Sequence, residues 1–187
     1  MWLGGISLIA SATKCCVEVG LDVYLIQHAE SLSEKEDPER PLSEEGKATM
    51  EKIGSLAVRL GINPDMIYHS GKLRAKQTAE ILAQHLRLSD KVRQRPGLAP
   101  LDQVLPTADW LQKEAASGTR SLAIVGHLPF LDKLASLLVA GNENVGVVGF
   151  QHGAIVKLVP AGRKYAVQSV IASNQPSRAP SASVEYD

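Results

Sequence analysis

The chain has 187 residues, of which 44% are hydrophobic and 21% charged, and its basic and acidic residues balance to a formal net charge of zero. This length fits one domain with a real apolar core, and the composition excludes a disordered or membrane-embedded chain. The neutral balance argues against a nucleic-acid partner, so any anion-binding site must be local.

The first 20 residues are set apart from the rest. An apolar run precedes Lys14, which reverses the order of a signal peptide, and the run is too short to span a bilayer. Cys15 and Cys16 are adjacent, so they predict neither a disulfide framework nor a zinc site and favour a reducing cytoplasm. We expect residues 1–20 to be a poorly ordered extension without stable membrane association. A weak signal or a peripheral anchor is the alternative.

From residue 21 onward, short apolar runs alternate with amphipathic segments. Residues 21–26 predict a buried strand, and the charged residues 31–41, with two prolines, predict a loop. Ser43 caps an expected helix whose apolar positions are Met50, Ile53, Ala57 and Leu60, with Gly61 as its stop. The later segments are a strand at 65–70, a helix at 72–86, an extended stretch at 91–102, a helix at 107–116, a strand at 120–127, a helix at 128–141 and a hairpin over 154–160 and 165–173.

This alternation predicts an α/β fold, a three-layer α/β/α sandwich with a mostly parallel central sheet. We expect one domain over residues 21–172. Residues 173–187 have the composition of a flexible tail.

Polar side chains follow several of the predicted strands. His28 comes after the first strand, Ser70 after the second with Arg74 close behind, and His127 just before a helix. Ligands of such sheets bind outside the carboxyl ends of the strands, and a helix N-terminus favours an anion. Two histidines and an arginine should therefore meet at one rim.

These residue types suit phosphate better than a metal. The arginine fork matches a phosphoryl group, a neutral imidazole can attack phosphorus, and a second histidine can bind the phosphoryl oxygens. The alternative reading is two histidines that only bond to loop backbone.

Four stretches of the sequence resemble the histidine phosphatase superfamily, also called the phosphoglycerate-mutase-like fold. They are LIQHAES, ERPLSEEGK, HSGKLRAKQTAEIL and LAIVGHLPFLDKL. They occur in the family's order between Leu21 and Ile171, and the resemblance is greatest to the short bacterial phosphohistidine phosphatases of the SixA type.

The resemblance implies a role for each matching residue. His28 falls on the nucleophile, and His127 on the second histidine, which contacts the phosphoryl oxygens. Arg74 and Arg40 fall on phosphate-binding arginines, and Ser70 would help to hold the site together. No metal or cofactor is implied, because Arg40, Arg74 and His127 would supply the positive charge.

Two positions depart from the family. Gln27 stands where the family has an arginine just before the nucleophile, so we expect it to bind phosphate through neutral hydrogen bonds and to weaken catalysis. Gly97 lies where many ester-cleaving members have a glutamate, which leaves Asp102 as a candidate acid. A phosphorylated imidazole leaves more readily than an alkoxide, so this absence favours phosphohistidine as substrate.

Six further residues are candidates of lower rank. We expect His69 to pack at the rim of the sheet and His85 to lie on an exposed helix face. His152 either lines the site or only opens a strand. Glu30 either orients the site or is a solvated acid in a loop. Lys72 and Lys76 fit a solvated face or a contact with an acidic partner.

The sequence thus predicts a cytoplasmic signalling phosphatase that dephosphorylates a phosphohistidine protein through a phospho-His28 intermediate. The first alternative is an inactive module that binds a phosphorylated partner, which Gln27 motivates. The second is a small-molecule phosphomonoesterase.

Overall fold

The structure, a computed structural model, describes residues 20–173. Its strands are β1 (Asp22–Gln27), β2 (Met66–His69), β3 (Val92–Gln94), β4 (Ser121–Gly126), β5 (Ile155–Ala161) and β6 (Lys164–Ile171). Its helices are α1 (Glu44–Arg59), α2 (Leu73–Leu86), α3 (Leu105–Ala116) and α4 (Phe130–Ala140), with one 3₁₀ turn at Ser89–Lys91. Apart from Gly20 and Ser173, the predicted extension and tail lie outside the described residues.

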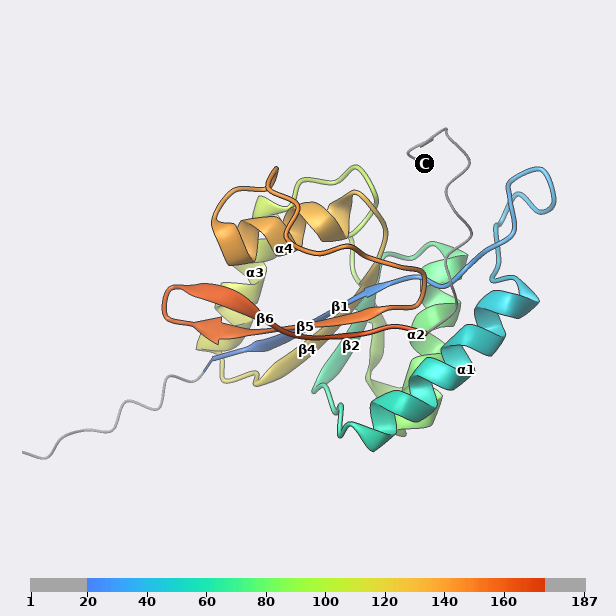
Figure 1. Ribbon diagram of the computed structural model, residues 1–187, viewed down its shortest axis with the longest axis horizontal. Coiled ribbons are helices and arrows are strands. Elements are labelled where there is room, and N and C mark those ends of the chain that lie inside the picture. The colour runs from blue at the N-terminus through green and yellow to red at the C-terminus, as the bar shows by residue number, and fades with distance from the viewer. Residues whose placement is uncertain (1–19, 174–187) are drawn as a thin grey trace, which may run out of the picture.

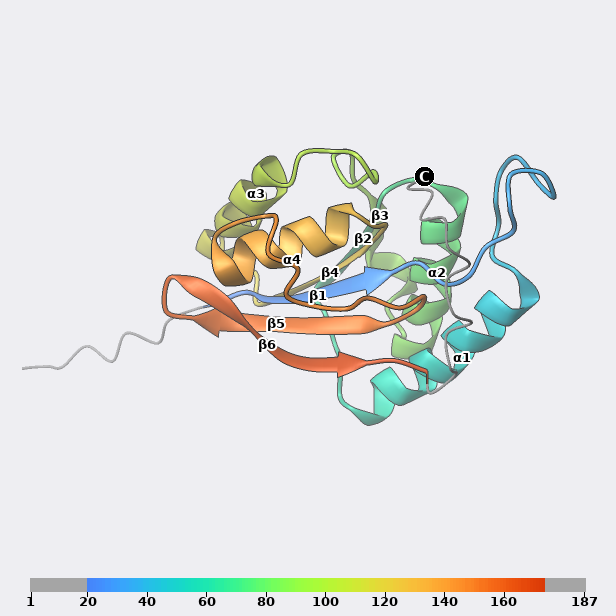
Figure 2. The same ribbon diagram turned by 45° about the horizontal axis from the view of Figure 1, so that its top comes forward.

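All six strands form one sheet in the order β3-β2-β4-β1-β5-β6 (Figure 2). β3, β2, β4 and β1 are parallel, whereas β5 runs antiparallel to β1 and continues into β6 as a hairpin. The sheet is therefore mostly parallel, as predicted. The carboxyl ends of the four parallel strands meet at one edge.

The helices cover both faces of the sheet. α1 and α2 lie on one side of it and α3 and α4 on the other, which gives the predicted three layers (Figure 1). Between residues 20 and 173, no helix has both the length and the apolar character that crossing a membrane requires.

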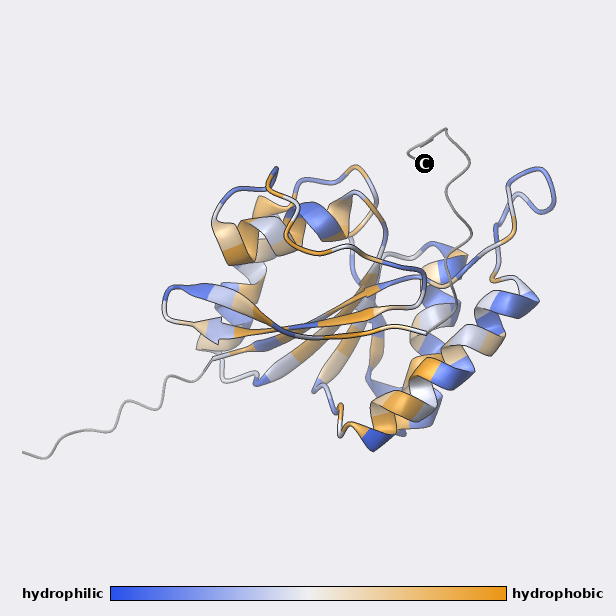
Figure 3. Ribbon diagram, in the orientation of Figure 1, coloured by the Kyte–Doolittle hydropathy of each residue, from blue (hydrophilic) through white to orange (hydrophobic). Residues whose placement is uncertain are grey.

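The core consists of two apolar clusters separated by the sheet. Tyr24 and Ile26 of β1 belong to the cluster under α1 and α2, while Val23 and Leu25 belong to the one under α3 and α4. Because both faces of β1 are covered, its residues read as a continuous apolar run rather than an alternating one. Coloured by hydropathy, the inner strands are mainly apolar and the outer helix faces polar (Figure 3).

The structure shifts several predicted boundaries and adds a short strand. Leu60 was predicted to share the apolar face of α1, which is wrong, because the helix ends one residue earlier and Leu60 is 57% exposed. α3 begins at Leu105 rather than Thr107, since Pro106 fits its first turn. The stretch 91–102 contains the short edge strand β3.

Candidate active site

His28 and His127 meet because their strands are neighbours. Gln27 at the end of β1 pairs with Gly126 at the end of β4, so the residue after each strand emerges at the same edge. The two imidazole rings lie 4.9 Å apart between centroids and are tilted by 55°. The two histidines therefore lie together at one rim of the sheet, as expected.

The environment of His28 assigns its tautomer. Its Nδ1 lies 2.7 Å from the carbonyl oxygen of Ala29, which can only accept, so Nδ1 carries the proton. The remaining nitrogen, Nε2, then holds a lone pair and accepts from the Arg74 Nε–H at 3.3 Å. Burial lowers the pKa of His28 to about 3, so the ring is neutral near pH 7. A neutral imidazole with an available Nε2 lone pair has the form that a nucleophile requires.

His127 is also neutral, which corrects the expectation that it supplies positive charge. Burial is the main reason that its pKa falls to about 2, and repulsion from the protonated form of His28 and from Arg74 adds to the effect. Its Nε2 shares a hydrogen bond of 2.6 Å with the Ser70 hydroxyl. Its Nδ1 is buried and has no partner within residues 20–173. His127 can therefore act as a neutral hydrogen-bonding group rather than as a source of fixed charge.

Arg74 reaches His28 from the first turn of α2 and is buried. The buried Thr78 holds this turn in place, because its hydroxyl donates to the Arg74 carbonyl oxygen at 2.8 Å and accepts from the Ala29 N–H at 3.1 Å. α2 is thus tied to the residue that follows His28. The position of the Arg74 guanidinium relative to the His28 imidazole is therefore set before any ligand binds.

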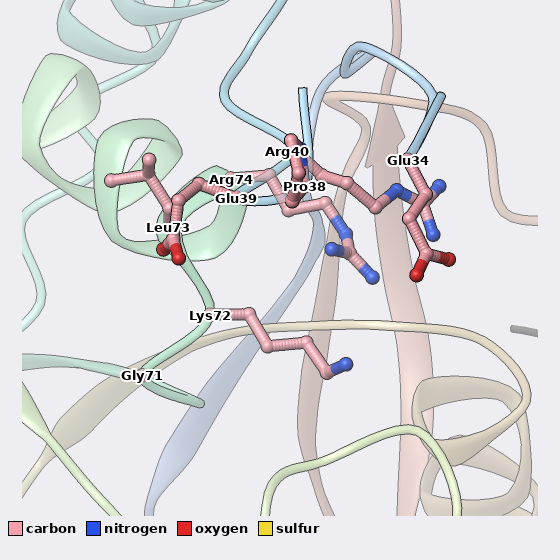
Figure 4. Close-up of a pocket in the computed structure, with 8 residues that line it drawn as sticks. All are labelled: Glu34, Pro38, Glu39, Arg40, Gly71, Lys72, Leu73 and Arg74. Atoms are coloured by element: carbon pink, nitrogen blue, oxygen red, sulfur yellow. The ribbon is translucent and has the colours of Figure 1, made fainter. Parts of the chain in front are cut away.

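Arg40 comes from the loop between β1 and α1. Its backbone is left-handed, with φ of 50°, a conformation that is unfavourable for arginine, and its Nε lies 3.4 Å from the Leu32 carbonyl oxygen. Arg40 and Arg74 both line a cleft of about 410 Å³, and Arg74 connects this cleft to His28 through its hydrogen bond. Glu34 and Lys72 line the same cleft, and the charged ends of these four side chains gather over it (Figure 4).

Gln27 is buried next to His28, and its environment includes a histidine to which the sequence analysis gave low rank. The His152 ring lies 5.4 Å from that of His28, and its Nδ1 donates to the His28 carbonyl oxygen at 3.1 Å. The same Nδ1 is 3.5 Å from Gln27 Nε2, but a nitrogen that donates to a carbonyl cannot also accept from an amide. Gln27 Oε1 has no partner among the described residues. His152 reaches the site because β5, which it precedes, runs antiparallel to β1.

The other candidates make structural contacts. Glu30 accepts from the Ser43 hydroxyl at 2.8 Å at the start of α1, and His69 accepts from the Gly71 N–H at 3.1 Å. His85 contacts Glu51 on the surface at 2.6 Å. Asp102 accepts from the Ala99 N–H at 2.7 Å within its own loop, and its role as an acid stays a prediction. Within residues 20–173, no group of three His, Cys, Asp or Glu side chains is arranged to hold a metal ion.

Comparison with known sequences identifies relatives of the chain. Residues 23–104, which contain His28, Arg40 and Arg74, match the sequence model of the histidine phosphatase superfamily, branch 1. A protein of Picosynechococcus sp., itself uncharacterized, is 30% identical over 144 residues, which cover 72% of this chain and 87% of that protein. The phosphohistidine phosphatase SixA of Escherichia coli is 25% identical over 123 residues, or 65% of this chain and 76% of SixA.

Solved structures share the fold. The protein histidine phosphatase SixA complexed with tungstate superposes with a TM-score of 0.73 at 22% identity, covering 81% of this chain and 96% of that one. Phosphoglycerate mutase from Bacillus anthracis superposes with a TM-score of 0.65 at 15% identity, covering 80% and 92%. The predicted phosphoglycerate-mutase-like fold is confirmed. The chain belongs to the histidine phosphatase superfamily.

Proposed function

We propose that the chain is a metal-independent phosphatase that removes the phosphoryl group from a phosphohistidine protein. The observation that carries this proposal is the neutral His28, whose Nδ1–H donates to Ala29 and whose Nε2 meets the Arg74 guanidinium. The relatives named as phosphohistidine phosphatases support the substrate class. We place the activity in cytoplasmic signalling, with the adjacent Cys15 and Cys16 as the argument for a reducing compartment.

The proposed reaction has two steps. His28 Nε2 attacks phosphorus in line, its bond to phosphorus forms, and the substrate P–N bond breaks as the leaving imidazole takes up a proton from solvent. Water then attacks phospho-His28, which releases inorganic phosphate and restores the neutral ring. Arg40 and Arg74 balance the charge of the phosphoryl oxygens, and His127 with Ser70 contributes hydrogen bonds.

Gln27 sets the expected rate. A charge-assisted hydrogen bond contributes about 1.5–3 kcal/mol, and losing one preorganised donor at a developing oxyanion costs on the order of 10²–10³ in rate. The amide of Gln27 retains N–H donors, so we propose a weakened enzyme rather than an inactive one.

The phosphoenzyme can be tested directly. Incubation with labelled phosphoramidate should place an acid-labile, base-stable phosphoryl group on the protein, and His28→Ala should abolish it. His85→Ala is the matched control, because His85 lies on the surface at Glu51 and should leave labelling unchanged. Labelling that persists in His28→Ala would remove the nucleophile assignment.

The inactive binding module is the second candidate, and Gln27 is the observation that favours it. Natural protein that binds phosphate but turns over no phosphoramidate, with turnover restored in Gln27→Arg, would establish it.

A substrate panel separates the remaining alternative, a small-molecule phosphomonoesterase. We expect phosphoramidate and a phosphohistidine protein to be hydrolysed at least about 10²-fold faster than sugar phosphates, because no strong acid faces an alkoxide leaving group. If Asp102 acts as an acid, Asp102→Asn will slow ester hydrolysis more than P–N hydrolysis. Sugar phosphates as the preferred substrates would contradict the phosphohistidine proposal.

A further inference from the structure

Lys72 lines the cleft that also holds Arg40 and Arg74, although the sequence suggested a solvated face or a contact with an acidic partner. It follows Gly71, whose φ of 92° turns the chain out of β2, and it occupies the N-cap position of α2. Its side chain lines the cleft together with Arg40 and Arg74, and it extends toward the Arg74 guanidinium (Figure 4). The fold therefore brings a third basic side chain to the cleft.

The ammonium of Lys72 has no local structural role. Within residues 20–173 its side chain makes no ion pair and no hydrogen bond, and it does not cap the helix that it begins. By contrast, Lys76, one turn further along the same helix, lies 3.9 Å from Glu80. The Lys72 charge nevertheless reaches the site: after burial and repulsion from protonated His28 and from Arg74, it is the next cause of the lowered pKa of His127.

The start of α2 is unfavourable for a lysine in the absence of an anion. N-cap positions favour Ser, Thr, Asp or Asn, and the N-terminal end of a helix carries partial positive charge. The first turn of α2 holds no acidic residue to offset this charge, and it adds Arg74. A bound phosphoryl group would relieve the repulsion between Lys72, Arg74 and the helix end.

The buried residue next to His28 brings no charge to the site. Gln27 is neutral, and the nearby His152 uses its Nδ1 to bond to the His28 backbone. We propose that Lys72 binds the phosphoryl group and supplies, from the start of α2, the positive charge that Gln27 does not bring. This inference rests on the proposed function and adds a phosphoryl-binding residue to it.

A double-mutant cycle tests the proposal. The four proteins are the natural chain, Lys72→Met, Gln27→Arg and the double variant, with Lys76→Met as the matched control on the same helix. Two quantities are measured in each: the dissociation constant for inorganic phosphate by calorimetry, and kcat/KM for phosphoramidate.

In the natural background we expect Lys72→Met to weaken phosphate binding and to lower kcat/KM by about 10-fold or more, as loss of a charge-assisted contact does. In the Gln27→Arg background the same change should cost less than about 3-fold, because the arginine then supplies the charge. Lys76→Met should stay within about 2-fold in both. Lys72→Met should also unfold at the same or a higher temperature, since it removes a cation from a positive helix end.

Two results would overturn the proposal: equal effects of Lys72→Met and Lys76→Met, or an equal loss from Lys72→Met with and without Gln27→Arg. If the protein does not fold with arginine at the buried position 27, Lys72→Arg is measured in place of the Gln27→Arg variants. The proposal then requires that Lys72→Arg retain phosphate binding and that Lys72→Met lose it. Should none of the proteins hydrolyse phosphoramidate, the proposed function fails, and the phosphate affinities still decide the role of Lys72.

Discussion

At His28 and His127, burial decides the charge of the imidazole. Both rings lie beside arginine and beside each other, in a place where an added proton would be poorly solvated and repelled. Burial lowers the pKa of His69 as well. His28 is therefore kept unprotonated near neutral pH without a partner base, and its Nε2 lone pair is available because the proton is held on Nδ1.

This burial predicts a loss of stability in mild acid. The folded-state pKa values of about 3 for His28 and about 2 for His127 lie below the unfolded value, so the unfolded chain binds protons first as the pH falls. The stabilisation is complete above the unfolded pKa of about 6.5 and is lost as the pH falls toward the folded values. Between pH 7 and pH 5 we expect each ring to lower the unfolding free energy by about 2 kcal/mol.

Urea denaturation at several pH values measures this loss. His127→Gln should remove about half of the decrease that the pair causes, since glutamine can still bond to Ser70 but does not titrate. An unfolding free energy that stays constant between pH 7 and pH 5 would show that the rings are not held neutral by burial.

At the scale of elements, the start of α1 is packed against the segment that follows His28. Ser43 caps the helix, and its hydroxyl and backbone N–H also contact Glu30. Gly46 lets the helix approach closely, because a Cβ placed there would lie 2.1 Å from the Glu30 carbonyl oxygen. The glycine in the first turn is thus needed for contact between α1 and the loop after His28.

Gly46→Ala should therefore destabilise the protein. Replacing glycine by alanine inside a helix normally stabilises it by roughly 0.5–1 kcal/mol, but here backbone must move, and overpacking costs about 1–3 kcal/mol. The reference variant is Gly54→Ala in the same helix, where the added Cβ would meet the side chain of His85, which can move more easily than backbone. Thermal unfolding of both variants measures the difference, and a stabilised Gly46→Ala would contradict the close contact.

At the scale of the whole molecule, the site joins segments that are far apart along the chain. His28 follows β1, Arg40 lies before α1, Ser70 and Arg74 flank the start of α2, and His127 follows β4. Parallel pairing of β1 with β4 and of β2 with β4 brings these ends together. A ligand at this rim contacts several elements at once, so its binding free energy stabilises the whole fold.

Inorganic phosphate should consequently raise the unfolding temperature. A ligand that binds only the folded state at 100 times its dissociation constant adds about 2.7 kcal/mol, which for a domain of this size corresponds to about 5–10 °C. Arg74→Met should abolish the shift, while sodium chloride at equal ionic strength controls for a general salt effect. A shift of equal size in Arg74→Met would mean that phosphate binds elsewhere.

The extent of successful prediction differs between fold and site. The strand that ends before His28, the Ser43 cap and the sandwich architecture follow from apolar periodicity and local capping chemistry, which act within a few residues. Local pattern could not predict that His152 and Lys72 lie near the candidate site. His152 reaches the site through antiparallel pairing of β5 with β1, and Lys72 through the turn at Gly71.

The sequence by itself determined the order of the elements, the family and the residues at the strand ends, since these depend on local pattern. Only the tertiary structure decided that His127 is neutral, that Lys72 lines the same cleft as Arg40 and Arg74, and that His152 lies beside Gln27. The physical reason is that charge state and side-chain neighbours depend on burial and strand pairing. Both arise from contacts between segments distant along the chain.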